Sequence, residues 1–208
     1  LGVVAAFTSW NFPVVLAARK IAPALAAGCS VILRPAEEAP GSAMSLVQCL
    51  HEAGVPAGVI NLINGSADTI SPVLLNESRV RKISLTGSAR VGKLLIKASA
   101  ETLKRTSMEL GGHAPVIIYA DADAEAIAEQ AALVKFKHCG QVCASPSRYF
   151  IHESQAESFT NKFIEIAQNF KLGNGMESGI DIGPLATKKR LKEVELMVSG
   201  TLKSGARL

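Results

Sequence analysis

Short apolar runs alternate along this chain with longer amphipathic stretches. The strands expected from the short runs cover residues 1–7, 30–33, 59–63, 82–86, 106–109, 115–119 and 148–152; the longer stretches predict helices over 14–27, 41–53, 69–76, 88–98, 123–137, 156–169 and 188–199. Strands that alternate with helices indicate βαβ units around a parallel sheet. The regular series stops around Gly111-Gly112, so we expect two incomplete α/β regions, over 1–110 and 111–208.

The composition narrows the class of protein. Apolar residues make up 48 % of the 208 positions and charged residues 19 %, which excludes a disordered chain. Aromatic residues are few (seven Phe, two Tyr, one Trp), so we expect a core of Ala, Val, Leu and Ile. The net charge of +4 is spread along the chain. With few rings available to stack on bases, we expect no nucleic-acid partner.

Three features bear on the location of the protein. The uncharged stretch 1–18 is interrupted by Thr8, Ser9, Asn11 and Pro13, so we expect no membrane span. Four cysteines in 208 residues are too few for a disulfide scaffold, which favours a reducing, cytoplasmic setting. The sequence opens Leu-Gly-Val without Met and ends abruptly, so we expect an internal piece of a longer protein.

One cysteine stands where a nucleophile would be useful. The segment Gly140-Gln-Val-Cys143 follows a predicted helix and lies in a turn, where a thiol can be accessible and have a lowered pKa. The alternative for any single cysteine is a buried, inert side chain. Cys139 and His138 lie nearby, but the other histidines are scattered, so we expect no metal site.

Two further side chains could assist such a nucleophile. Glu109 ends a predicted apolar strand beside two glycines, where a carboxylate with a raised pKa could act as a general base. Asn11 follows the first strand and could donate its amide N–H to an oxyanion. A solvated strand-end Glu and an ordinary turn Asn are the alternatives.

Two segments have features of a nucleotide site. Gly87-Ser-Ala-Arg-Val-Gly92 joins a predicted strand to a helix, where a glycine lets phosphate approach the free N–H groups of the helix. It matches neither the dinucleotide fingerprint nor the P-loop. Arg34-Pro-Ala-Glu37 follows the second strand, where a carboxylate can bind both hydroxyls of an adenosine ribose. Structural roles for this glycine and this glutamate are the alternatives.

Together and in this order, the motifs Trp-Asn-Phe-Pro, Arg-Pro-Ala-Glu, Leu-Thr-Gly-Ser, Glu-Leu-Gly-Gly and Gly-Gln-Val-Cys resemble the aldehyde dehydrogenase superfamily, of the NAD(P)-dependent, hydrolytic type. Glu109 stands 34 residues before Cys143, which is also similar to the family. The resemblance implies an α/β fold: a Rossmann-like parallel sheet from the dinucleotide-binding domain over 1–110, then part of the nucleophile-bearing catalytic domain over 111–208.

The resemblance also implies roles for individual residues. The thiolate of Cys143 would attack the aldehyde carbon to give a thiohemiacetal, whose oxyanion the Asn11 amide and the Cys143 backbone N–H would stabilise. Hydride loss would leave a thioester, and Glu109 would activate the water that hydrolyses it. Lys20 matches a family lysine near the active site and would have a supporting role.

NAD is the cofactor that the resemblance implies, with NADP as the alternative. Glu37 would bind the adenosine ribose and repel a 2′-phosphate, whereas Arg34, where the family usually has Lys, could meet such a phosphate. Gly87 and Ser88 would contact the pyrophosphate. The full set of expected cofactor-binding residues is Thr8, Ser9, Trp10, Arg34, Ala36, Glu37, Gly65, Thr86, Gly87, Ser88, Val91, Leu110 and Gly111.

Two alternative functions stay open. A CoA-acylating semialdehyde dehydrogenase has the same fold but needs no hydrolytic Glu, and a non-catalytic relative tends to lose its nucleophile; Glu109 and Cys143 favour the hydrolytic enzyme. The family's Glu-x-Phe-Gly-Pro segment, which clasps the nicotinamide ribose, is outside these residues, so we expect them alone to be inactive. We expect a small-molecule aldehyde substrate and a homo-oligomer at full length. Residues 143–148 look like those of enzymes for semialdehydes or for a broad range of aldehydes, and Arg148 is expected to be structural.

Overall fold

The computed structural model describes residues 2–207, which form two compact units that divide between Gly111 and Gly112. Leu1, which the predicted first strand includes, lies outside the described residues. Each unit is an α/β arrangement, as predicted. The elements of the first unit are β1 (Val3–Phe7), α1 (Pro13–Ala26), β2 (Ser30–Arg34), α2 (Pro40–Glu52), β3 (Ile60–Leu62), α3 (Ala67–Asn76), β4 (Val80–Gly87), α4 (Ala89–Ala100) and β5 (Arg105–Leu110).

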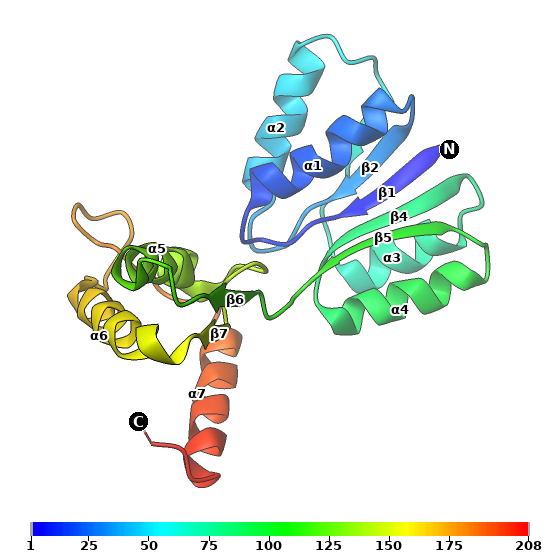
Figure 1. The fold of residues 1–208 in the computed structure, drawn as a ribbon. Helices are drawn as coiled ribbons and strands as arrows, with labels where there is room; N and C mark the ends of the chain where they lie inside the picture. The colour runs from blue at the N-terminus through cyan, green and yellow to red at the C-terminus, as the bar shows by residue number, and fades with distance from the viewer. Residues whose placement is uncertain (1, 208) are drawn as a thin grey trace. The chain divides into compact units, whose positions relative to one another are not determined.

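The first unit is a fully parallel five-stranded sheet in the order β3-β2-β1-β4-β5. The chain moves outward from β1 through β2 to β3, then crosses back to place β4 on the other side of β1 and β5 beyond it (Figure 1). The order therefore reverses between β1 and β4. In sheets of this Rossmann-like kind, ligands bind beyond the carboxyl ends of the strands at this reversal.

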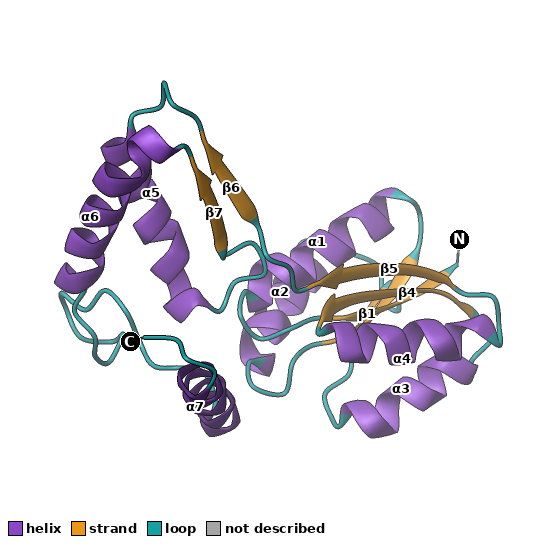
Figure 2. Ribbon diagram, turned by 60° about the horizontal axis from the view of Figure 1, so that its bottom comes forward, coloured by secondary structure: helices purple, strands orange, loops and turns teal. Residues whose placement is uncertain are grey.

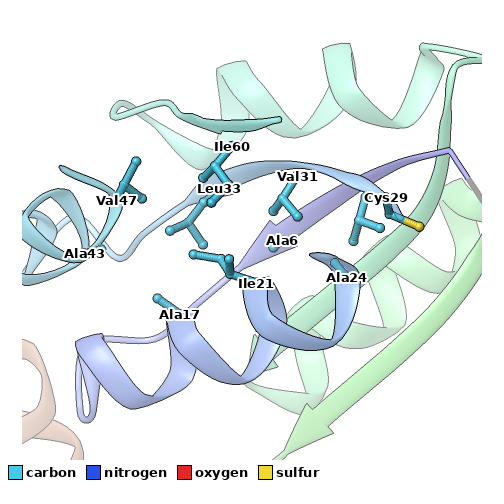
Figure 3. Packing of buried hydrophobic residues seen from close by; sticks show 11 residues of the cluster. Ala6, Ala17, Ile21, Ala24, Cys29, Val31, Leu33, Ala43, Val47 and Ile60 are labelled. Carbon is cyan, nitrogen blue, oxygen red and sulfur yellow. The ribbon is translucent and has the colours of Figure 1, made fainter. Parts of the chain in front are cut away.

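Helices cover both faces of this sheet. Ala17 and Ile21 of α1 pack with Val31 and Leu33 of β2 on one face (Figure 3). Helices α3 and α4 cover the opposite face (Figure 1), where Leu74 of α3 belongs to a second buried cluster. Successive side chains of a strand point to opposite faces, and a strand covered on both sides is therefore apolar throughout. Apart from Phe7 and Cys29, the buried core of this unit consists of Ala, Val, Leu and Ile, as predicted.

The second unit has a small sheet of two parallel strands, with helices α5 and α6 packed on one face (Figure 2). Its core includes Phe159, whose ring lies within 6 Å of Tyr149 and Phe163. The expectation of a purely aliphatic core is wrong here. The elements are β6 (Pro115–Ile118), α5 (Ala124–Phe136), the 3-10 turn η1 (Lys137–Gly140), β7 (Arg148–Ile151), α6 (Glu153–Asn169) and α7 (Lys188–Lys203).

Among the predicted boundaries that differ from the structure, one is explained by a capping interaction. The strand predicted to reach His152 ends at Ile151, because the His152 ring accepts a hydrogen bond from the Ser154 backbone N–H and caps α6. Helix α7 continues through Gly200, where a stop was expected, to Lys203. No helix within residues 2–207 is both long enough and apolar enough to cross a membrane.

Candidate active site

A pocket of about 280 Å³ lies in the first unit, at the carboxyl ends of β1, β2 and β4. It is therefore at the point where the strand order reverses, the position at which α/β sheets bind ligands. Most of the residues expected to contact a cofactor line it: Thr8, Ser9, Trp10, Arg34, Ala36, Glu37, Thr86, Gly87, Ser88 and Val91.

A network around Arg34 organises one wall of the pocket. Arg34 is 8 % exposed, and its side chain donates hydrogen bonds to the Gly65 carbonyl from Nε (3.2 Å) and Nη2 (2.8 Å). Nη2 also donates to the Glu37 carboxylate, which in addition accepts from the Ala67 backbone N–H at the first turn of α3 (3.3 Å). The guanidinium and a helix N-terminus thus hold the carboxylate at the pocket wall.

Two polar groups in the pocket suit a nucleotide. Thr8 is 6 % exposed, and its hydroxyl oxygen has no hydrogen-bond partner among the residues that the structure describes. A buried hydroxyl without a partner is costly unless a ligand satisfies it. Ser88 caps α4 by accepting a hydrogen bond from the Val91 N–H (3.3 Å), so this helix begins at the pocket and its free N–H groups suit a phosphate. These residues fit a dinucleotide.

Three residues of the expected cofactor set do not line the pocket. Gly65 contributes its carbonyl to Arg34 instead. Leu110 packs in the core against α4, where a Cβ on Gly92 would come within 3.0 Å of it. That close approach explains the second glycine of the segment 87–92 as a packing residue. Gly111 is exposed at the end of the unit.

Sequence reasoning missed several residues of the pocket. Glu38, Ala67 and Ser71 line it together with the apolar Phe7, Leu85 and Leu95. Ala67 and Ser71 belong to α3, a helix distant in sequence from the Arg-Pro-Ala-Glu motif, and no local pattern marks them. For Glu38 the sequence did offer an indication, because this residue directly follows Glu37.

Lys20 is buried in α1, and its ammonium donates to the Ser84 hydroxyl on β4 (3.0 Å). Burial lowers the pKa of Lys20 to about 8, although the negative charge of Glu109 partly offsets this by favouring the protonated form. Glu109 itself is exposed on β5, an edge strand, opposite Thr86 of β4. Of the two sequence interpretations of this residue, its exposure matches the solvated strand-end Glu rather than a carboxylate buried at the strand end.

In the second unit, Cys143 is exposed in a turn that follows η1. Three consecutive residues before it, His138, Cys139 and Gly140, have left-handed backbone conformations with φ of 56°, 57° and 70°. Such conformations are uncommon for residues other than glycine and often mark functional loops. The backbone before Cys143 is therefore held in a conformation that residues other than glycine rarely adopt.

Side chains on both sides of Cys143 hold this turn. Gln141 donates to the His138 carbonyl (3.1 Å) and accepts from the Ala186 N–H (3.1 Å). Ser145 is buried and donates to the Lys135 carbonyl (3.2 Å), while Ser147 donates to the His113 carbonyl (2.8 Å). The thiol thus lies on a short, anchored segment open to solvent. Arg148 begins β7 and is also exposed.

Within residues 2–207 no three His, Cys, Asp or Glu side chains gather as a possible metal site.

Comparisons with known proteins then decide the family. The profile of the aldehyde dehydrogenase family matches residues 1–208. The chain belongs to this family.

Aldehyde dehydrogenases of known sequence and structure align with the whole chain. It is 48 % identical to the 3-sulfolactaldehyde dehydrogenase of Pseudomonas putida and 42 % identical to the succinate semialdehyde dehydrogenase of Acinetobacter baylyi, each over 208 residues. A solved succinate-semialdehyde dehydrogenase from Burkholderia pseudomallei is 42 % identical with a TM-score of 0.94. The betaine aldehyde dehydrogenase of Staphylococcus aureus, solved with NAD⁺, is 35 % identical with a TM-score of 0.93.

The alignments cover the whole of this chain but less than half of each of these aldehyde dehydrogenases. All of the present chain aligns, but it spans only 43 % of the length of the Pseudomonas and Acinetobacter proteins and 41 % of the Staphylococcus structure. The residues described here therefore correspond to less than half of each of these relatives.

Proposed function

We propose that this chain is part of an enzyme that oxidises an aldehyde to a carboxylic acid with NAD(P), by covalent catalysis at Cys143 and hydrolysis by water. The observation that carries the proposal is the pocket at the strand reversal of the first unit, with the buried hydroxyl of Thr8 and the ion-paired Glu37 in its wall. Membership of the aldehyde dehydrogenase family supports the same reaction class.

In the proposed mechanism, each residue has one task. The thiolate of Cys143 attacks the aldehyde carbon, and its sulfur–carbon bond turns the carbonyl into a tetrahedral alkoxide that expels hydride more readily than the aldehyde does. The Asn11 amide and the backbone N–H of Cys143 stabilise that alkoxide. The bound cofactor supplies the acceptor for the hydride.

Hydrolysis completes the cycle. Loss of hydride leaves a thioester on Cys143, and Glu109 takes a proton from the water that attacks the thioester carbon. The sulfur–carbon bond then breaks, which releases the carboxylic acid and regenerates the thiolate. Lys20 has a supporting role: its buried ammonium and Glu109 interact electrostatically, as the pKa of Lys20 reflects.

The cofactor is proposed to be NAD rather than NADP. Glu37 places a negative charge at the pocket wall, and Glu38 adds a second carboxylate to the lining. Both charges disfavour a 2′-phosphate. Two of the Arg34 nitrogens already have partners: Nε and Nη2 donate to the Gly65 carbonyl, and Nη2 also donates to the Glu37 carboxylate. Arg34 therefore supports the carboxylate rather than opposing it.

The proposed substrate is an aldehyde that carries a second, negatively charged group. Relatives that are 39–48 % identical are named for 3-sulfolactaldehyde and for succinate, aspartate and glutarate semialdehydes, each of which carries a sulfonate or a carboxylate beside the aldehyde. A betaine aldehyde dehydrogenase, named for a cationic substrate, is 35 % identical. Kinetics of the full-length gene product with succinate semialdehyde, a sulfonated aldehyde and an uncharged aldehyde of similar length distinguish these classes.

We further propose a cytoplasmic homo-oligomer whose 208-residue segment is inactive by itself. The four free thiols support a reducing compartment, and the coverage of 43 % of the Pseudomonas and Acinetobacter relatives supports an incomplete catalytic site. The expected result is no aldehyde-dependent formation of NADH by these residues alone. Robust turnover would refute the inactivity, and light scattering of the full-length product tests the oligomer.

Two measurements test the proposed chemistry directly. Iodoacetamide should alkylate Cys143 much faster than Cys49, although both are exposed, because alkylation requires the thiolate, the form in which a catalytic cysteine reacts. Equal rates at the two sites would contradict the proposal. In the full-length product, the free acid should accumulate whether or not CoA is present; an acyl-CoA product would instead support the acylating reaction.

A further inference from the structure

We propose that Ser9 is a positioning residue that fixes the orientation of the Asn11 amide. The Ser9 hydroxyl donates to Oδ1 of Asn11 at 2.7 Å, between two side chains that are both half-buried. This inference rests on the proposed function, in which Asn11 donates an N–H to the developing oxyanion. Ser9 thereby gains a task other than lining the cofactor pocket.

An asparagine amide needs such orientation before it can act. Its two ends have nearly the same size but opposite polarity: the NH₂ stabilises an anion, whereas the carbonyl oxygen repels it. The terminal torsion of Asn has a broad energy profile, so the side chain does not select one orientation by itself. Donors of an oxyanion hole are effective because they are oriented before the reaction begins.

The backbone around Asn11 is already held on both sides. The Thr8 N–H bonds to the Arg34 carbonyl of β2 (3.2 Å), and the Leu16 N–H bonds to the Phe12 carbonyl in the first turn of α1 (2.9 Å). Between these two anchors, rotation of the amide is the freedom that can invert its polarity. The Ser9 hydroxyl has a single proton, and by giving it to Oδ1 it directs the carbonyl end toward itself and the NH₂ end away.

A double-mutant cycle in the full-length gene product tests this role. We expect Asn11→Ala to lower kcat by about 10²–10³, the usual effect of removing one oxyanion donor. Ser9→Ala should lower kcat by about tenfold, the rate factor that corresponds to one hydrogen bond. Ser9→Thr keeps the hydroxyl and should restore most of the rate. Ser45→Ala, an exposed serine on α2, is the matched control.

The decisive result is the double variant. If Ser9 acts through Asn11, Ser9→Ala should slow the Asn11→Ala enzyme no further. A full additional tenfold loss in that background would assign Ser9 a separate, structural role and overturn the inference, as would a wild-type kcat for Ser9→Ala. A wild-type kcat for Asn11→Ala would instead remove the proposed oxyanion role itself, so the two failures are distinguishable. Thermal unfolding of each variant identifies any loss of folded protein.

Discussion

In the first unit, helices cover both faces of a five-stranded sheet, whereas in the second unit α5 and α6 cover one face of two strands. On the other face of that small sheet, Ile117 and Phe150 are exposed, and α7 buries none of its residues. The candidate chemistry differs in the same way: the first unit offers a walled pocket and the second an open turn with a thiol. In the first unit, helices packed on both faces of the sheet shape the candidate site. In the second unit, a short segment held by hydrogen bonds shapes it instead.

The largest expected effect concerns the turn of the second unit. Cys143→Ala in the full-length gene product should remove aldehyde oxidation to background, a loss on the order of 10⁶ in kcat for a covalent nucleophile. Stability should not change, because the side chain is exposed. Steady-state formation of NADH measures the first quantity and urea unfolding the second. Cys49→Ser is the matched control; comparable losses in the two variants would contradict the assignment.

A pair of core substitutions tests whether the two units are independent. Leu33→Ala in β2 and Phe159→Ala in α6 each remove a buried side chain, and each should lower the free energy of unfolding by about 2–5 kcal/mol. The only tryptophan, Trp10, lies in the first unit, so its fluorescence reports on that unit. Leu33→Ala should shift the Trp10 transition in urea, and Phe159→Ala should leave it in place. An equal shift in both variants would show that the units unfold together.

A buried lysine makes the stability of the first unit depend on pH. Lys20 has a pKa of about 8 in the folded chain, against 10.5 as its ordinary value. Between these values the unfolded chain binds a proton that the folded chain does not, so stability should rise with pH from about 8 to 10.5, by on the order of 3 kcal/mol. Below pH 8 the cost of burying the charge is present in full. No lysine is buried among the described residues of the second unit.

Urea unfolding monitored at Trp10, at several pH values, measures this rise. Lys20→Met removes the titrating group and should flatten the curve over the same window. Lys104, whose pKa burial also lowers, remains in both proteins, so the difference between them isolates Lys20. Parallel curves for the two proteins would contradict a lowered pKa at this site.

The sequence predicted the first unit well because local and long-range signals agree there. The run Val31 to Leu33 is apolar, comes shortly after a glycine turn and lies in an interior strand of the sheet, as expected. The strand that carries Glu109 was harder to interpret, because its sequence pattern does not distinguish an interior strand from an edge strand. The position of a strand in the sheet depends on which strands lie beside it. Two residues show that tertiary packing also decides which side chains reach the site. Leu110 packs against α4 and does not line the pocket, whereas the placement of α3 brings Ala67 to the pocket wall.

The smallest effect concerns the pocket wall, and it tests whether the first unit selects the cofactor as its geometry suggests. Glu37→Gln keeps the shape but removes the charge that pairs with Arg34. We expect the KM for NAD to rise by about 10- to 100-fold, the range for hydrogen bonds to a charged group. The KM for NADP should fall, because the repulsion of the 2′-phosphate decreases while Arg34 gains a free donor. Glu52→Gln, an exposed substitution on α2, is the control. If both cofactors weaken to the same extent, Glu37 supports the pocket wall without discriminating between them, and selection must come from other residues, such as Glu38.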